Sequence, residues 1–203
     1  MGRLAEAVAA HIGTGSAEKL ARLRIGVAGC GGLGSNCAML LARSGFCRFV
    51  LVDHDVVEVS NLNRQYFFPA QVGQLKVVAL SEALQGLDPG MQIHTVAQRL
   101  RPETAPAVFT GCDALVECLD APEAKAWLLA ACAPRVRLYV GASGVAGHGR
   151  APNLGVRWLR EGCCVVGDEV SEVGENLPVL GPGVGAAAAL QADVVLDYFL
   201  RRE

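Results

Sequence analysis

The sequence predicts an α/β protein of the Rossmann-like class, with a mostly parallel central sheet, helices on both faces and a short antiparallel C-terminal extension. Three observations support this fold class. Short apolar runs alternate with amphipathic segments along most of the chain, which is typical of strands buried under crossover helices. A glycine-rich turn joins the first apolar run to the first amphipathic segment, and polar residues follow the apolar runs. The 203 residues are 52% hydrophobic but only 5% aromatic, a composition that suits tight packing of helices on a sheet.

The first strand–turn–helix–strand unit occupies residues 25–53. An apolar run at 25–28 is expected to be a buried strand, and a helix pattern at 33–43 stops at Ser44-Gly45. A second apolar run at 49–52 ends on Asp53. The turn between the first strand and the helix contains glycines in the G-x-G-x-x-G spacing: Gly29, Gly31 and Gly34. This order of elements predicts a nucleotide-binding unit.

The glycines in this turn have a physical reason. A nucleotide phosphate binds best at a helix N-terminus, where free N–H groups and the helix dipole favour negative charge. A side chain at Gly31 would hold the phosphate away, and a side chain at Gly34 would push the helix off the strand. Asp53, at the carboxyl end of the second strand, is placed to accept hydrogen bonds from ribose hydroxyls.

Polar residues are dense after this acid. The chain continues D-H-D-V-V-E-V-S-N-L-N-R-Q over 53–65, and G-Q-L-K follows at 73–76. Arg64 and Lys76 beside a helix N-terminus suit a triphosphate better than the pyrophosphate of NAD. A solvated surface loop is the alternative interpretation. The length of the 54–73 loop favours a functional role, and we interpret His54 as a partly exposed side chain near the adenosine rather than a base.

The remaining elements follow from the same patterns. We expect an N-terminal helical segment at 1–23, broken at 13–15, and a helix at 74–87 with Lys76 in its first turn. Asp120 ends a buried strand at 113–119, so it should face the same crevice as Asp53, although it could also cap the next helix. The other expected elements are strands at 92–97, 136–142, 154–159 and 163–166, and helices at 102–110, 122–133 and 184–200. The acidic, Gly/Pro-rich segment 167–183 is expected to be a mobile loop.

Three motifs carry a family resemblance: G-x-G-G-L-G-S, D-x-D-x-V-x-x-S-N-L-N-R-Q and G-x-x-K. They resemble the ThiF/MoeB/HesA family of ubiquitin-activating-enzyme-like adenylyltransferases, over most of the chain. The resemblance implies an enzyme that uses ATP to adenylate the C-terminal glycine of a small ubiquitin-fold sulfur carrier ending in Gly-Gly. The compact length is most similar to the ThiF proteins of thiamine biosynthesis. Carriers for molybdopterin, cysteine synthesis or tRNA modification stay open.

The resemblance also implies roles for individual residues. Asp53 would hold the ribose, while Asn61, Arg64 and Lys76 would contact phosphates. Asp120 would bind magnesium. Arg64, Lys76 and Asp120 are the expected catalytic residues. The cofactor-binding set is completed by these positions: Gly29, Gly31, Gly32, Gly34, Asp55 and Gln65.

Two features of the family are missing or unmatched. The usual N-terminal R-Y-x-R-Q motif is absent, so no arginine that reaches a partner subunit is assigned. No C-x-x-C pair occurs among the eight cysteines, so we expect neither a structural zinc site nor disulfides. Cys163 and Cys164 appear outside the central-sheet pattern and are the only candidates for a covalent intermediate with the carrier.

Composition bounds the remaining properties. A formal charge of −2 without a basic stripe argues against nucleic-acid binding. The longest apolar stretch, 181–200, contains Gln191, Asp193 and Asp197 and is not expected to span a membrane. With no N-terminal signal pattern, the protein is expected to be soluble and cytoplasmic. The apolar C-terminal helix and the family analogy suggest a homodimer.

We expect one domain over 1–203, consisting of the helical segment 1–23, a nucleotide-binding core at 24–150, and C-terminal strands, loop and helix at 151–203. Two other functions fit parts of the sequence. A nicotinamide-dependent oxidoreductase shares the glycine turn and Asp53 but does not explain Asn61, Arg64 or Lys76. A non-catalytic nucleotide-binding partner in sulfur transfer would fit the missing arginine motif.

Overall fold

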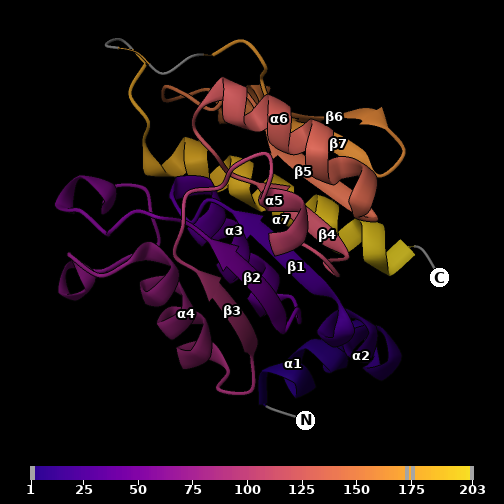
Figure 1. Cartoon of the computed structure of the whole chain (residues 1–203). Helices are drawn as coiled ribbons and strands as arrows, with labels where there is room; N and C mark the ends of the chain where they lie inside the picture. Colours follow the sequence, from indigo (N-terminus) through magenta and orange to yellow (C-terminus); the bar gives the residue numbers. More distant parts are fainter. Residues whose placement is uncertain (1–2, 172–173, 175–176, 202–203) are drawn as a thin grey trace.

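A seven-stranded sheet forms the centre of the protein (Figure 1). The computed structural model describes residues 3–171, 174 and 177–201. The strands lie in the order β3-β2-β1-β4-β5-β7-β6, and every neighbouring pair except β6 with β7 is parallel. The strand bounds are β1 Arg24–Ala28, β2 Arg48–Val52, β3 Gln92–Val96, β4 Ala114–Glu117, β5 Leu138–Ala142, β6 Gly155–Arg160 and β7 Cys163–Gly167. The predicted Rossmann-like class with an antiparallel C-terminal extension is confirmed.

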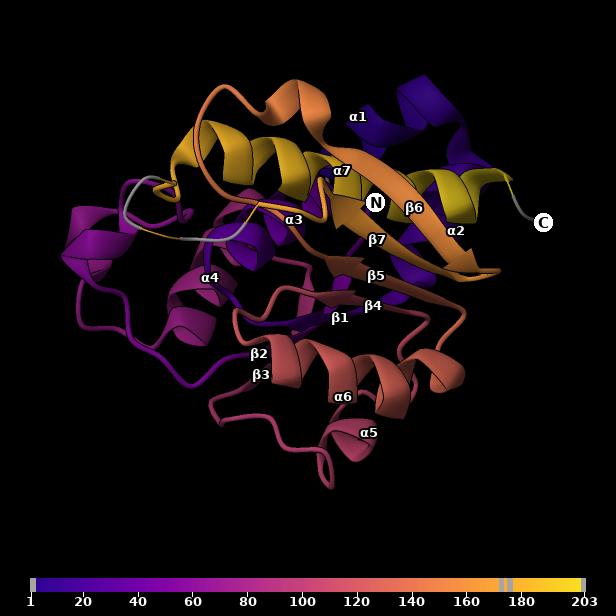
Figure 2. The ribbon, with the colours of Figure 1, turned by 90° about the horizontal axis from the view of Figure 1, so that it is seen from above.

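Helices cover both faces of this sheet (Figure 2). One face packs against α3 (Gly32–Arg43), α4 (Lys76–Leu87) and α7 (Gly181–Arg201), and the other against α5 (Ala105–Val108) and α6 (Pro122–Cys132). Alternate residues of one strand therefore enter different cores: Leu51 belongs to the α3 side, whereas Val50 and Val52 belong to the α6 side. Burial on both faces explains the continuous apolar runs.

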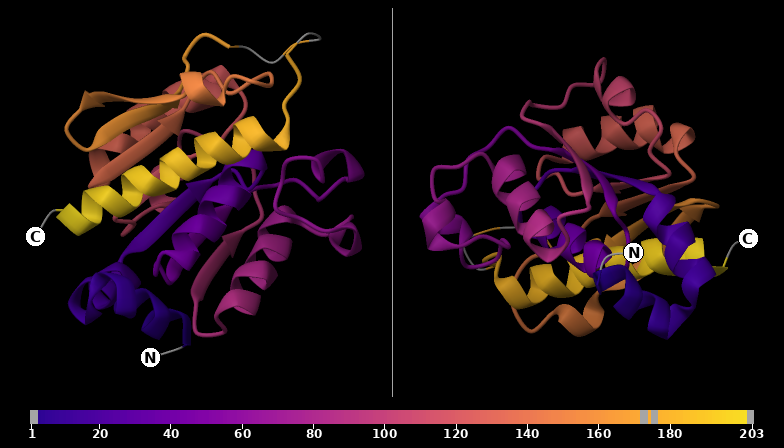
Figure 3. Two further views of the ribbon diagram at one scale, coloured as in Figure 1. Left: turned by 180° about the vertical axis from the view of Figure 1, so that it is seen from behind. Right: turned by 90° about the horizontal axis from the view of Figure 1, so that it is seen from below.

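Two N-terminal helices, α1 (Arg3–Ile12) and α2 (Thr14–Arg22), lie at one end of the molecule (Figure 3). The chain enters β1 two residues after α2, so this pair lies at the amino ends of the strands, away from the strand ends that hold the predicted site. Gly13, with φ of +83°, separates the two helices, as the break predicted at 13–15 requires.

α7 is long and apolar enough to cross a membrane by length and composition, and it is the one such helix in the described part of the chain. However, 44% of its apolar window is buried inside the protein. Ala188 and Val195 of α7 belong to the hydrophobic core that also contains residues of α3 and β5. Figure 3 shows α7 lying along this side of the sheet. We therefore interpret α7 as a core helix.

The predicted elements are confirmed, with many bounds shifted by one to three residues. The helix predicted at 102–110 is only Ala105–Val108, because Pro106 lacks an N–H and fits only the first turn of a helix. The helix predicted from 74 begins at Lys76. The C-terminal helix begins at Gly181 rather than 184, since Pro182 is tolerated in a first turn. Short 3-10 turns occur at Val59–Asn61, Pro69–Gln71, Ala133–Arg135 and Ala151–Asn153.

The C-terminal strands hold the main correction. β7 lies inside the central sheet, parallel to β5, so the expectation that Cys163 and Cys164 fall outside the central-sheet pattern is wrong. Both thiols are buried because each face of β7 packs on a core. The predicted mobile loop at 167–183 includes residues 172–173 and 175–176, which lie outside the described residues, and its mobility stays a prediction.

Candidate active site

The glycine turn after β1 has the close approaches that its sequence predicts. Gly29 has φ of +92°, a conformation that L side chains rarely adopt. A Cβ on Gly34 would overlap the carbonyl oxygen of Gly29 and lie 3.1 Å from Cγ1 of Val27. A Cβ on Gly31 would meet only Nε2 of Gln65, at 3.7 Å. Gly29 and Gly34 are thus required by the turn itself, whereas Gly31 leaves space above it.

The amino end of α3 faces this space without a capping side chain. Gly31 is the N-cap residue and no side chain accepts a hydrogen bond from the first turn. The first N–H groups of an α-helix have no acceptor within the helix and carry the positive end of its dipole. This end of α3 is therefore suited to an anion.

A cavity of about 290 Å³ opens at the carboxyl ends of the parallel strands. Gly29 follows β1, Asp53 follows β2, Arg99 follows β3, Asp120 follows β4 and Val145 follows β5, and all five line the cavity. The cavity includes the point between β1 and β4 where the strand order reverses, which is the usual ligand site of such sheets. Of the predicted site residues, these also line it: Gly31, Gly32, Asp55, Arg64, Gln65 and Lys76.

Asp53 fixes the glycine turn from the end of β2. Its side chain is only 8% exposed, and its Oδ2 accepts a hydrogen bond of 2.7 Å from the backbone N–H of Cys30. Its Oδ1 accepts a second bond, of 2.9 Å, from the N–H of Asp55. Each carboxylate oxygen can accept a further bond, so contact with a ribose hydroxyl remains geometrically open.

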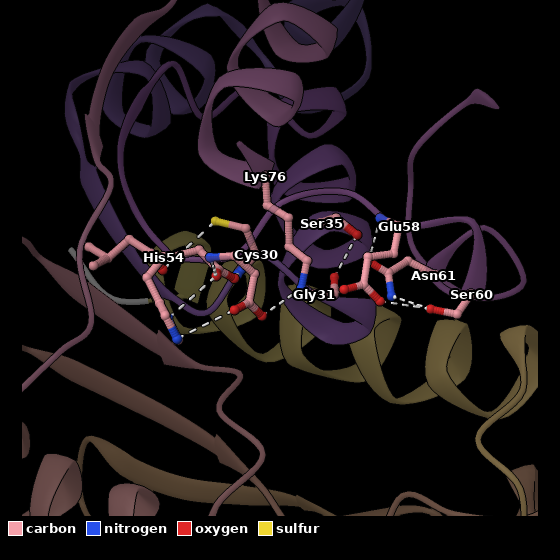
Figure 4. A network of polar contacts seen from close by, with 11 residues as sticks. Cys30, Gly31, Ser35, His54, Glu58, Ser60, Asn61 and Lys76 are labelled. Carbon is pink, nitrogen blue, oxygen red and sulfur yellow. Dashed lines mark hydrogen bonds and ion pairs between the residues drawn. The ribbon is translucent and has the colours of Figure 1, made fainter. Parts of the chain in front are cut away.

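Lys76 is buried at the start of α4 and forms an ion pair with Asp55 (Figure 4). The distance from its Nζ to Oδ2 of Asp55 is 2.9 Å. Hydrogen bonding to this lysine holds the pKa of Asp55 below its ordinary value. His54 lies beside the pair, with Nε2 3.4 Å from Oδ1 of Asp55, and its side chain is 48% exposed. The acid thus offsets the unfavourable placement of a lysine in a first helical turn.

Arg64 and Gln65 reach the cavity from the loop after β2. Arg64 is half-buried, and its Nη1 donates to the carbonyl of Ser60 at 3.0 Å and to Oδ1 of Asn63 at 2.8 Å. Gln65 is 9% exposed, and its Oε1 has no hydrogen-bond partner among the described residues.

Asn61 has a different place from the other predicted residues. Its Oδ1 accepts a bond of 3.1 Å from the N–H of Glu58, and its Nδ2 donates to Oγ of Ser60 (Figure 4). The side chain is buried and does not line the cavity. In this structure Asn61 shapes the loop that carries Arg64; its predicted phosphate contact stays a prediction.

Asp120 lines the cavity as an exposed carboxylate. α6 begins at Pro122 with Ala121 as its N-cap residue and no side-chain capping bond, so Asp120 does not cap this helix. No hydrogen bond or ion pair to Asp120 occurs within the part of the chain that the structure describes. The carboxylate is therefore open to a cation.

The buried ion pair between Glu117 and Lys125 was not predicted from the sequence. Glu117 is 2% exposed, and its Oε1 lies 2.9 Å from Nζ of Lys125 and accepts a 2.7 Å bond from the N–H of Leu119. Nζ of Lys125 also donates to the carbonyl of Ala142 at 2.9 Å. Burial raises the pKa of Glu117, and Lys125 opposes that rise. Gln191 of α7 donates to the carbonyl of Glu117, so the network ties the carboxyl ends of β4 and β5 to α7.

The apolar and basic wall of the cavity was also missed. Gln98, Arg99 and Leu100 follow β3 directly, and Trp127 comes from α6. Positive charge on Arg99 contributes to the lowered pKa of Asp55. The rule that singled out Asp53 and Asp120, that side chains after parallel strands meet at one edge, also applies to residues 98–100. The alternating pattern of residues 92–97 gave no reason to look there.

The cysteines offer no activated thiol. All eight fall within the described residues, and seven are buried while Cys47 is half-buried. Burial raises the pKa of Cys163 and raises that of Cys164 to about 12. Since the thiolate is the nucleophile, a covalent role for either cysteine has no support in this conformation.

The donor set fits magnesium and a nucleotide triphosphate. Magnesium prefers carboxylate oxygens together with phosphate oxygens, and Asp120 offers an open carboxylate beside the amino end of α3. Arg64 and Lys76 supply two cations at the same cavity. The wall at Gly31, where a Cβ would meet only Nε2 of Gln65, leaves room for phosphate.

Comparison with known proteins gives a family match over nearly the whole chain. The family model described as ThiF family matches residues 4–203. The Sulfur carrier protein ThiS adenylyltransferase of Escherichia coli is 31% identical over 180 residues, which cover 86% of this chain and 71% of that protein. Adenylyltransferase and sulfurtransferase MOCS3 of Bos taurus is 38% identical over 133 residues, covering 65% of this chain and 29% of the relative. The chain spans about a third of the length of MOCS3 and of other long curated relatives that it matches, and more of the ThiS adenylyltransferase.

Solved structures share the fold. E. coli tRNA N6-threonylcarbamoyladenosine dehydratase, TcdA, in complex with ATP superposes with a TM-score of 0.88 at 21% identity, covering 97% of this chain and 93% of that one. E. coli MccB with ATP gives a TM-score of 0.71 at 22% identity, covering 92% and 59%. At such identities the likeness concerns the fold alone.

Proposed function

This chain belongs to the ThiF family, and from that premise we propose that it is an ATP-dependent adenylyltransferase. Its substrate is the C-terminal glycine carboxylate of a small ubiquitin-fold sulfur carrier protein ending in Gly-Gly. The product is the carrier acyl-adenylate, with release of pyrophosphate. The protein acts in the cytoplasm as a soluble homodimer that binds no nucleic acid.

One observation carries this proposal. The bare amino end of α3, the cations Arg64 and Lys76, and the acids Asp53 and Asp120 converge on a single cavity at the switch point of the sheet. A nicotinamide cofactor would need the glycine turn and Asp53, but it gives no role to Arg64 and Lys76 together. ATP with magnesium gives a role to the amino end of α3, to both cations and to both acids.

The reaction mainly has to overcome charge repulsion. A carboxylate oxygen of the carrier attacks the α-phosphorus of ATP, a P–O bond to the β-phosphate breaks, and pyrophosphate leaves with the bonding electron pair. No proton transfer is needed, so positioning and positive charge account for catalysis. Magnesium, when bound, neutralises phosphate charge.

The chain's own residues divide this work. Arg64 offers a planar fork of donors and Lys76 a point charge, and both counter charge that builds up on phosphate oxygens. Asp55 holds Lys76 at the cavity wall until a phosphate competes for it. Asp53 accepts hydrogen bonds from the ribose while it fixes the turn, and Asp120 holds the metal. Asn61 shapes the loop through its bond with the N–H of Glu58, and Gln65 contributes a further contact to the phosphates.

The carrier is proposed to be ThiS-like, with a role in thiamine biosynthesis. The support is the E. coli ThiS adenylyltransferase, of which the chain covers 71%. The MOCS3 and TcdA likenesses name other activities for those proteins, so the substrate is open to direct test.

The test is ATP–pyrophosphate exchange with a panel of ubiquitin-fold carriers ending in Gly-Gly, and with tRNA that carries N6-threonylcarbamoyladenosine. We expect exchange that depends on one carrier and on its terminal glycine. Arg64→Ala should lower the exchange rate by about 100-fold, the scale of losing one preorganised donor. Arg43→Ala is the matched control, because Arg43 is an exposed arginine at the far end of α3.

Three results would contradict the proposal. ATP binding without exchange on any carrier would favour a non-catalytic partner in sulfur transfer. Tight NADH binding without ATP binding would favour an oxidoreductase. Turnover of the modified tRNA alone would replace the carrier as substrate.

A further inference from the structure

Two residues of α3 join the loop that carries Arg64 to the glycine turn. Ser35 and Asn36 follow the glycine turn, and their side chains contact both the turn and the 64–66 segment of the loop. We propose that these two residues, the α3 clasp, are positioning residues that fix Arg64 relative to the phosphate-binding end of α3. This inference rests on the proposed function and adds residues to it.

Ser35 forms the first half of the clasp (Figure 4). It is fully buried, and its Oγ donates a 2.6 Å hydrogen bond to the carbonyl of Gly31. The same oxygen accepts a 2.9 Å bond from the backbone N–H of Tyr66. One hydroxyl thus uses its donor and an acceptor position to join the glycine turn to the loop.

Asn36 forms the second half. Its Nδ2 donates to the carbonyl of Gly32 at 2.7 Å and to the carbonyl of Arg64 at 2.9 Å. Both partners are acceptors, so the network itself fixes which end of the amide faces them. The bond to Arg64 spans 28 residues of sequence and holds the backbone from which the guanidinium projects.

Apart from the clasp, the hydrogen bonds of Arg64 itself stay within its loop. The N–H groups of Arg64 and Gln65 bond to the carbonyl of Asn61, which lies in the same loop. Nη1 of Arg64 bonds to Ser60 and Asn63, also in the loop. A Cβ added at Gly32 would lie 3.8 Å from the carbonyl oxygen of Arg64, which shows how closely the loop approaches α3.

Neither clasp residue lines the cavity, so each acts through Arg64 rather than on a ligand. A displacement of about 1 Å in a catalytic group costs up to about 100-fold in rate. Because a transition-state contact is lost while ground-state binding is kept, the loss should fall on kcat with little change in KM for ATP.

The experiment compares Asn36→Ala and Asn36→Asp with Ser44→Ala. Asn36→Asp keeps the size of the side chain but cannot donate, and Ser44→Ala removes a bond of 2.9 Å from Oγ to the carbonyl of Leu40 at the far end of the same helix. We expect both Asn36 variants to lower kcat for pyrophosphate exchange about tenfold, with KM for ATP within about twofold, and Ser44→Ala to match the unsubstituted protein.

A double-mutant cycle separates positioning from general stability. In the Arg64→Ala background, Asn36→Ala should lower kcat by less than about twofold, because the residue that it positions is gone. Equal losses from Asn36→Ala with and without Arg64 would overturn the proposal. So would full activity of Asn36→Asp.

Amide hydrogen exchange tests the contacts of the α3 clasp independently of the enzyme activity. The N–H of Tyr66 should exchange faster in Ser35→Ala, and the 64–66 segment faster in Asn36→Ala, than in Ser44→Ala. Unchanged protection in the Ser35 and Asn36 variants refutes the clasp whatever the activity. If the unsubstituted protein exchanges no pyrophosphate, the proposed function fails, and the amide exchange still tests the contact.

Discussion

Substitution of two glycines in the same turn should separate nucleotide binding from folding. At Gly31, φ is −79°, and a Cβ would contact only Nε2 of Gln65, at 3.7 Å. Because a Cβ there meets no backbone atom, Gly31→Ala should cost less unfolding free energy than Gly34→Ala. At Gly34, a Cβ would overlap the Gly29 carbonyl oxygen and lie 2.9 Å from its carbon. Gly34→Ala should cost about 1–3 kcal/mol through forced backbone shifts.

Gly31→Ala should instead act on ATP affinity. The methyl group at position 31 occupies the space over the amino end of α3, where phosphate would approach the free N–H groups. Loss of one charge-assisted hydrogen bond costs about 1.5–3 kcal/mol, so Gly31→Ala should weaken ATP binding at least about tenfold.

The two quantities are measured by urea unfolding and by titration calorimetry with ATP. Gly15→Ala, in the first turn of α2 with nothing within 4 Å of an added Cβ, is the control for a general glycine effect. Unchanged ATP affinity in Gly31→Ala would refute phosphate binding at the amino end of α3. Normal stability of Gly34→Ala would refute the close packing of turn and helix.

Three further predictions concern Asp120, the buried ion pair and the cysteines. Asp120→Ala should lose magnesium-dependent exchange at least about tenfold while its melting temperature is unchanged, since the carboxylate is exposed; unaltered metal dependence in a magnesium titration would contradict this. Lys125→Met leaves the buried Glu117 carboxylate unpaired and should cost about 3 kcal/mol of unfolding free energy at pH 8. Burial raises the pKa of Glu117 in the folded state. A carboxyl group of this kind stabilises the protein below the ordinary glutamate pKa, and that stabilisation is lost as pH rises through the raised value. The loss in urea melts should thus be smaller at pH 5, and an equal loss at both pH values would refute the charge argument. Cys163→Ala should retain exchange within about twofold, and a covalent carrier adduct that disappears in this variant by mass spectrometry would contradict the buried-thiol interpretation.

The sequence predicted those residues of the candidate site whose position depends only on spacing along one segment of the chain. The glycine turn, Asp53 and Lys76 lie in or beside local elements whose period and end signals are readable, and each occupies its predicted place at the carboxyl end of a strand or in the first turn of a helix. Asp120 followed from the rule that parallel strands end at one edge.

Other parts depended on pairings that no local pattern encodes. β7 reads as a short strand of an extension, but it pairs with β5 because its two apolar faces need cores on both sides of the sheet. The sequence predicts a phosphate contact for Asn61, which stays a prediction, while its bond with the N–H of Glu58 is visible only in three dimensions.

The sequence by itself thus determined the Rossmann-like fold, the family and most of the charged groups at the cavity, because these follow from periodicity, glycine spacing and local motifs. Only the tertiary structure decided that Glu117 pairs with Lys125, that Arg99 and Trp127 join the cavity, and that Asn36 reaches Arg64. The physical reason is that these contacts depend on the directions of side chains from separate elements, which are set when the helices pack on the sheet.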